Sequence, residues 1–202
     1  MALCKPPVAN LLDLDRYPVD KLNLDAADAV VAQAHESLER NGACVFPGFL
    51  TEEGIFCLAL EAQALSDLAW PSPTAVTPYY GKLAEHFPDG HPRQNCQIAD
   101  MGLVADFNVP PCSAIRRLYE WAPLRQFLAA VVEFEQLFLF SDPCQSVNIS
   151  VIDEGGQQPW HFDSGRFTVT LLLQAPRGGG DFEYVPRLRD VGDENYEGVA
   201  EV

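Results

Sequence analysis

Basic residues are scarce in this sequence. Its 202 residues include 13 lysines and arginines against 29 aspartates and glutamates, so the formal net charge at pH 7 is −16. A surface with this charge repels the phosphate backbone of nucleic acids and the headgroups of anionic lipids. We therefore expect neither nucleic acid nor a membrane surface among the partners of the chain.

Long apolar runs and paired cysteines are also lacking. No stretch approaches the roughly 20 apolar residues that a helix needs to cross a bilayer, and residues 1–7 do not read as a secretion signal. No two cysteines form a C-x-x-C pair or a zinc-ribbon spacing. They are Cys4, Cys44, Cys57, Cys96, Cys112 and Cys144. These features predict a cytoplasmic protein with reduced thiols, several of them in the core.

Hydrophobic residues make up 48% of the chain, which at this length favours one globular domain with a sizeable core. Apolar spacing and capping residues predict helices in its first part. We expect these helices at Asp25–Arg40, from Thr51 to about Leu68, and at Ser113–Glu133, where Pro123 begins a second segment. The expected buried face of the Thr51 helix comprises Ile55, Leu58, Ala59, Ala62 and Leu65. Between the helices we expect a short strand at Ala43–Phe46, a long proline-rich loop at Trp70–Arg93, and a strand within Gln94–Phe107.

The character of the chain changes at Gln136, from helices to short runs rich in β-branched and aromatic residues. We expect strands at Leu137–Phe140, Val147–Ile152, Trp160–Phe162, Phe167–Gln174 and Phe182–Val185. Helices followed by clustered strands predict an α+β fold, with residues 23–135 mainly helical and residues 136–202 forming a sheet. In two of the strands polar residues alternate with apolar ones, as at Asn148 and Thr168, and these polar faces line either a cavity or the solvent.

The strongest chemical signal is the tetrapeptide Trp160-His161-Phe162-Asp163. His161 and Asp163 are two residues apart, so on a strand both side chains point to the same face. An imidazole and a carboxylate placed together can bind a first-row transition metal. The alternative is a structural hydrogen-bonded pair at the end of a strand.

Several segments around this motif resemble the 2-oxoglutarate- and Fe(II)-dependent oxygenases. The similarity is narrower to the branch that contains the free-amino-acid halogenases and their hydroxylase relatives. The matching segments are residues 146–150, 160–163, 167–174 and 179–186, continued by Arg187–Arg189, Asp193–Tyr196 and, in the long loop, His91–Arg93. The clear resemblance covers roughly residues 137–197, whereas the N-terminal helices agree only in general plan.

This resemblance implies a fold, two cofactors and a set of site residues. The fold would be a double-stranded β-helix, a jelly-roll or cupin-like barrel with the N-terminal helices packed on one sheet. His161 and Asp163 would be catalytic ligands of Fe(II), and Asn148 and Thr168 would face the site and contact 2-oxoglutarate or substrate. Arg93, in the long loop, would bind the carboxylate of a small polar substrate such as a free amino acid, which the enzyme would hydroxylate with O2; the alternative for Arg93 is an exposed surface residue.

The resemblance also bears on the role of Trp160 and on the type of reaction. Trp160 is either a substrate contact or, as its alternation away from the metal face favours, a core residue. In the halogenating members of the branch a small residue replaces the acid of the H-x-D motif and leaves room for chloride. The carboxylate of Asp163 therefore favours hydroxylation over chlorination.

The resemblance also implies a second histidine downstream of Asp163, followed by an arginine that anchors 2-oxoglutarate. The remaining histidines, His35, His86 and His91, all precede the motif. We therefore expect the sequence to be a fragment whose barrel is incomplete at its C-terminus. The alternative is a short, non-catalytic cupin-like binding module or an inactive remnant.

Overall fold

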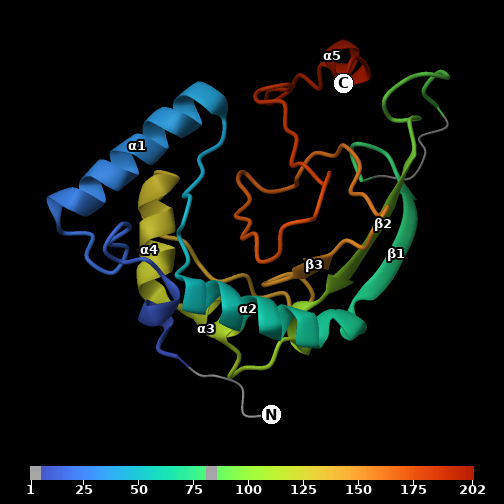
Figure 1. Cartoon of the computed structure of the whole chain (residues 1–202). Coiled ribbons are helices and arrows are strands. Elements are labelled where there is room, and N and C mark those ends of the chain that lie inside the picture. The colour runs from blue at the N-terminus through green and yellow to red at the C-terminus, as the bar shows by residue number, and fades with distance from the viewer. Residues whose placement is uncertain (1–5, 81–85) are drawn as a thin grey trace. The chain divides into compact units, whose positions relative to one another are not determined.

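The computed structural model describes residues 6–80 and 86–202 (Figure 1). The prediction for Cys4, and that part of the predicted loop which spans residues 81–85, lie outside them. The described residues divide into two compact units, each built from several stretches of the chain. The first comprises residues 6–69, 104–149 and 172–175, and the second comprises residues 70–80, 86–103, 150–171 and 176–202. Helices together with a small antiparallel sheet confirm the predicted α+β class.

Helix α1 of the first unit spans Asp25–Asn41, almost as the sequence predicts. Two aspartates in its first turn complement the positive end of the helix dipole. The helix ends at Gly42, whose φ of 72° places it in the left-handed region and whose N–H donates to the Leu38 carbonyl. Helix α1 packs against α4, at Ala122–Val131 (Figure 1), where the imidazole of His35 donates from Nε2 to the Ala130 carbonyl at 2.9 Å.

Helix α2 spans Glu52–Leu65 and continues as a short 3-10 turn at Ser66–Leu68, as the Thr51 capping signal predicts. The Thr51 hydroxyl accepts from the Gly54 N–H at 3.0 Å. The predicted buried face is wrong by about one residue. The buried positions are Gly54, Cys57, Leu58 and Glu61, whereas Ile55 is 43% exposed. A side chain at position 54 would collide with the Leu11 backbone, so this close approach sets the rotation of the helix.

Helices α3 (Ala114–Glu120) and α4 (Ala122–Val131) are the two segments predicted within Ser113–Glu133, with Pro123 in the first turn of α4 as expected. Glu61 is buried because its carboxylate caps α3, accepting from the N–H groups of Ala114 at 2.9 Å and Ile115 at 3.1 Å. A polar side chain on the buried face of α2 thereby fixes α2 against α3.

The remaining elements of the first unit are 3-10 turns at Val8–Leu11 and Asp106–Asn108. The predicted strand at Ala43–Phe46 is irregular chain instead. Its Phe46 joins an aromatic cluster in which ring centroids lie 5.4–6.5 Å apart, completed by Tyr17, Phe49 and Phe127. The Tyr17 hydroxyl donates to the Pro47 carbonyl at 2.8 Å. Ring packing, rather than strand pairing, therefore holds this segment.

The sheet has the strand order β1-β2-β3, with β1 at Trp70–Val76, β2 at Gln97–Val104 and β3 at Ile149–Val151. Strand β2 lies within the segment where the sequence predicts a strand. The prediction of a loop at Trp70–Arg93 is wrong for its first seven residues, which form strand β1. They pair antiparallel with β2 from Trp70↔Leu103 to Val76↔Gln97. Pro71 and Pro73 are compatible with this pairing because β1 is an edge strand, whose outward N–H groups need no partner.

Strand β3 is the only strand that the described residues form after residue 136. Its alternation is as predicted, since Ile149 is buried while Asn148 and Ser150 are exposed. The other four expected strands are irregular chain, at residues 137–140, 160–162, 167–174 and 182–185. Several of their apolar side chains are exposed, as at Val169, which is 57% exposed, and Phe182, which is 81% exposed. The last element is a short helix, α5, at Tyr196–Ala200.

The structure also bears on the predictions about membrane spans and cysteines. Within residues 6–80 and 86–202, no helix combines the length and the apolar character that spanning a bilayer requires. The five cysteines that the structure describes form no disulfide with one another. Burial raises the pKa of the Cys44 thiol above its ordinary value.

The cysteines are expected to differ in reactivity toward iodoacetamide. At pH 8 the exposed Cys96, Cys112 and Cys144 should be alkylated first. Alkylation of Cys44 and Cys57 should lag, because burial limits access to both side chains and disfavours the thiolate of Cys44. Peptide mass mapping over a time course measures this order, and modification of Cys57 as fast as that of Cys112 would contradict the packing of α2.

Candidate functional site

His161 and Asp163 converge in the second unit, as the H-x-D spacing predicts, although the segment that carries them is not a strand. Nε2 of His161 lies 3.3 Å from Oδ1 of Asp163. The imidazole is largely covered, with 21% of its side-chain surface exposed, whereas the carboxylate is 48% exposed. Of the two side chains that could bind a metal, the imidazole of His161 is therefore sheltered and the carboxylate of Asp163 faces solvent.

Hydrogen bonds fix which nitrogen of His161 carries the proton. Nδ1 lies 2.8 Å from the carbonyl oxygen of Pro159, and because a carbonyl can only accept, Nδ1 is the donor. The amide nitrogen of Gln158 lies 3.3 Å from Nε2, which suits an Nε2 lone pair that accepts. In the neutral imidazole the lone pair of Nε2 therefore faces the carboxylate of Asp163, an arrangement that suits a metal ion between the two atoms, whereas in the imidazolium Nε2 donates to that carboxylate.

Thr168 lies beside this pair, as expected for a residue that faces the site. Its hydroxyl donates a short hydrogen bond to Oδ2 of Asp163 and leaves Oδ1 directed toward His161. A hydrogen bond to the outer oxygen of a carboxylate orients the inner one. The role of Thr168 visible here is therefore to position Asp163.

Two other predicted site residues have surroundings of their own. In the first unit, the Asn148 amide lies within hydrogen-bond distance of the carbonyls of Cys144, at 3.0 Å, and Val147, at 3.2 Å, when its nitrogen is the donor. In the second unit, Trp160 is partly buried. Contact of Asn148 with 2-oxoglutarate, and of Trp160 with substrate, therefore stay predictions.

The pair fits two adjacent ligands of a divalent metal. Donor atoms about 2.1 Å from one metal and at right angles to each other are about 3 Å apart, close to the observed 3.3 Å between Nε2 and Oδ1. The Nδ1–H donated to a backbone carbonyl is the arrangement that metal-binding histidines commonly use. Among the residues that the structure describes, no three or more His, Cys, Asp or Glu side chains gather around one point, so a third ligand is not identified there.

Tyr80 also belongs to the site, because it contacts both His161 and Gln158. No sequence signal points to this residue. Its ring centroid lies 4.9 Å from that of His161, and its hydroxyl accepts from the Gln158 amide at 3.2 Å. Burial, and secondarily the negative charge of Asp163, raise the pKa of Tyr80 above its ordinary value, although the Gln158 hydrogen bond opposes them. Tyr80 therefore stays a neutral phenol at neutral pH.

Arg93 lies in a neighbouring aromatic cluster of the same unit. Its Nε donates to the Tyr196 hydroxyl at 3.0 Å, and its guanidinium carbon stands 4.2 Å from the centroid of the Tyr79 ring. The Tyr79 ring in turn lies 5.2 Å from that of Phe162, the residue between the two candidate ligands. The hydrogen bond to Tyr196 raises the pKa of Arg93, which is a cation at any working pH.

Arg189 is the second cation of this cluster and is also missed by sequence reasoning. Its guanidinium carbon lies 4.0 Å from the centroid of the Phe162 ring. One carboxylate joins the two arginines: Oε2 of Glu194 is 3.0 Å from Arg189, and Oε1 is 3.8 Å from Arg93. The only sequence signal for this grouping is that the segments containing Arg93, Arg189 and Glu194 all belong to the resemblance.

The other histidines have structural contacts instead. The His91 ring stacks on Phe87 with centroids 4.1 Å apart and lies 4.4 Å from Tyr196, while its Nδ1 accepts from the Arg93 N–H. His86 is exposed and also lies against Phe87, at 4.3 Å. Neither belongs to a group of metal-binding side chains with His161 and Asp163.

The chain matches no protein-family model, no curated protein and no solved structure.

Proposed function

We propose that this chain is part of a 2-oxoglutarate- and Fe(II)-dependent dioxygenase. The enzyme hydroxylates an unactivated carbon of a small polar substrate, of which a free amino acid is an example. The observation that supports this most is the His161–Asp163 pair, in which Nε2 and a carboxylate oxygen lie 3.3 Å apart with the protonated Nδ1 turned away.

The residues of the site have distinct tasks in this proposal. When bound, Fe(II) and 2-oxoglutarate together supply the activation of O2. His161 and Asp163 hold the metal, Pro159 fixes the tautomer of the imidazole, and Thr168 holds the carboxylate in place. A carboxylate at position 163, rather than a small side chain, favours hydroxylation over halogenation because it occupies the metal position that a halide would take.

The proposal also includes a complete barrel. Further chain beyond residue 202 would complete the jelly-roll fold and supply the second histidine, which is the third metal ligand, and the arginine for 2-oxoglutarate. The exposed apolar side chains at residues 167–172 and 182–185 support this, because strands with one apolar face are stable only when another layer covers them. Sequencing of the coding DNA past the codon for Val202 tests this part directly.

The experiment that tests the function is an anaerobic titration of the native, full-length protein with Fe(II) and 2-oxoglutarate. We expect the visible metal-to-ligand charge-transfer band of a chelated 2-oxo acid. The band should be lost in His161→Ala, because this change removes one of three metal ligands. Loss of a residue that only supports a ligand already lowers metal affinity by about 10–100-fold, and loss of the ligand itself should lower it further.

His86→Ala is the matched control for this titration, since His86 is exposed and its ring lies against that of Phe87. It should keep the full band. Absence of the band in the wild-type protein, together with absence of O2-dependent consumption of 2-oxoglutarate, would favour a non-catalytic binding module. A band that survives in His161→Ala would show that the metal binds elsewhere.

A further inference from the structure

We propose that Arg93 and Arg189 form a binding site for a small organic carboxylate, and that Glu194 is an internal carboxylate which an incoming ligand displaces. The inference rests on the proposed function only in taking the incoming carboxylate as that of the substrate. Its new content is the pairing of Arg93 with Arg189 and the competing role of Glu194.

The two guanidinium groups are held by aromatic rings rather than by a set of acidic partners. Arg93 stands over Tyr79 and Arg189 over Phe162, at 4.2 and 4.0 Å, and the two rings lie 5.2 Å apart. Stacking leaves the edges of a guanidinium available for hydrogen bonds in its plane. Both edges can therefore serve one anion, as their shared contact with Glu194 demonstrates.

The ion pairs of Glu194 with Arg93 and Arg189 are weak enough for another carboxylate to replace Glu194. Its side chain is 40% exposed, and the arginines are 31% and 33% exposed, so water and salt screen the ion pairs. The contact with Arg93 is long, at 3.8 Å, which leaves this arginine without a close carboxylate partner among the ion pairs of the described residues. An external carboxylate could meet both cations at hydrogen-bond distance.

The surroundings define the ligand class. The rings of Tyr79 and Phe162 lie beside the two cations, and the Tyr196 hydroxyl is already engaged as acceptor from Arg93. A carboxylate with a short apolar or mixed chain would place its charge on the arginines and its chain against the rings. With a net charge of −16 on the whole sequence, the paired cations also provide a local positive site in an otherwise repulsive field.

The test is a metal-free titration of the native protein with sodium propionate, followed by ¹⁵N NMR of the arginine Nε–H groups, with sodium chloride at equal ionic strength as reference. We expect propionate-specific shifts of the Arg93 and Arg189 signals. In Glu194→Gln the apparent affinity should rise about twofold to fivefold, since exposed ion pairs of this kind are broken at that cost. In Arg189→Ala it should fall by at least that factor.

The control is Glu197→Gln, which removes the same charge from an exposed position of α5. It should leave the propionate affinity within experimental error of wild type. Equal gains in Glu194→Gln and Glu197→Gln, shifts no larger than those of chloride, or unchanged binding in Arg189→Ala would each overturn the proposal. None of these results depends on iron, so they are distinguishable from failure of the charge-transfer titration.

Discussion

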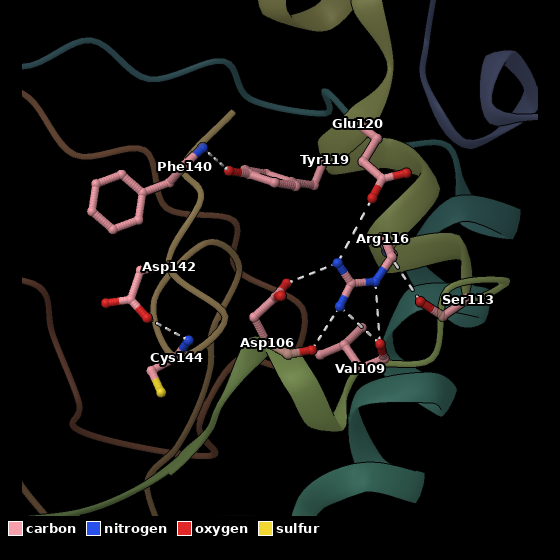
Figure 2. A network of polar contacts seen from close by, with 9 residues as sticks. All are labelled: Asp106, Val109, Ser113, Arg116, Tyr119, Glu120, Phe140, Asp142 and Cys144. Atoms are coloured by element: carbon pink, nitrogen blue, oxygen red, sulfur yellow. Dashed lines mark hydrogen bonds and ion pairs between the residues drawn. The ribbon is translucent and has the colours of Figure 1, made fainter. Parts of the chain in front are cut away.

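Replacing Arg116 by alanine is expected to lower the free energy of unfolding by about 3–5 kcal/mol, because it leaves a buried carboxylate without its partner. In the first unit, Nη1 of Arg116 lies 3.0 Å from Oδ1 of Asp106, and the two side chains are only 14% and 9% exposed. Figure 2 shows this guanidinium at the centre of a polar network. Its Nη2 also donates to the backbone carbonyls of Asp106, at 2.6 Å, and Val109, at 2.9 Å.

The prediction is specific to a forked, planar cation. Arg116→Lys keeps the charge but cannot reach both the carboxylate and the two carbonyls, so it should be intermediate in stability. The matched control is Arg40→Ala, which breaks an ion pair with Glu36 whose side chains are each 67% exposed. That change should cost less than about 1 kcal/mol.

Urea denaturation followed by circular dichroism measures these differences as shifts in midpoint at constant slope. If Arg116→Ala and Arg40→Ala prove equally mild, the Arg116 network contributes no more than a surface pair. The turn at Asp106–Asn108 would then be held in place mainly by the buried Val109.

The helices could be predicted because their signals are local. Thr51 caps α2 through its own hydroxyl, Gly42 adopts the left-handed conformation that ends α1, and Pro123 lies in the first turn of α4. Each of these effects acts within about one turn of chain, so neighbouring residues in the sequence are enough to identify it.

What the sequence could not predict depends on long-range contacts. Glu61 on the buried face of α2 is paired with α3, more than 50 residues away. The strand β1 contains prolines that ordinarily indicate a loop, and only the position at the sheet edge makes them compatible. Likewise, alternation at residues 167–171 predicts a strand, but a strand also needs a neighbour to receive its backbone hydrogen bonds.

In the candidate site, too, the local arrangement could be predicted and the long-range one could not. The two-residue spacing placed His161 and Asp163 together, and the expectation that Thr168 faces them agrees with its hydrogen bond to Asp163. The pairing of Arg93 with Arg189 through Glu194 joins segments about 100 residues apart, and no local pattern indicates it.

Replacing Asp163 by alanine is expected to weaken binding of Fe(II) by at least about 100-fold, and Thr168→Val should weaken it by about 10-fold. The first change removes a ligand of the proposed site, whereas the second removes only the hydroxyl that holds Oδ2, the kind of support whose loss costs about 10–100-fold. Thr168→Ser retains the hydroxyl and should restore affinity to near that of wild type. Anaerobic equilibrium titration of the native protein with Fe(II) alone measures all three.

Thr170→Val is the control for Thr168→Val, since Thr170 is exposed and has the same chemistry two residues along the chain. A purely general effect of losing a hydroxyl in this segment would weaken both variants alike, and the positioning role of Thr168 would then fail. If instead Asp163→Ala binds Fe(II) as wild type does, the 3.3 Å contact of Asp163 with His161 is a structural pair and not a metal site. A graded loss from Thr168→Val to Asp163→Ala follows only if the carboxylate is a ligand and the hydroxyl orients it, which separates these two interpretations of the H-x-D motif.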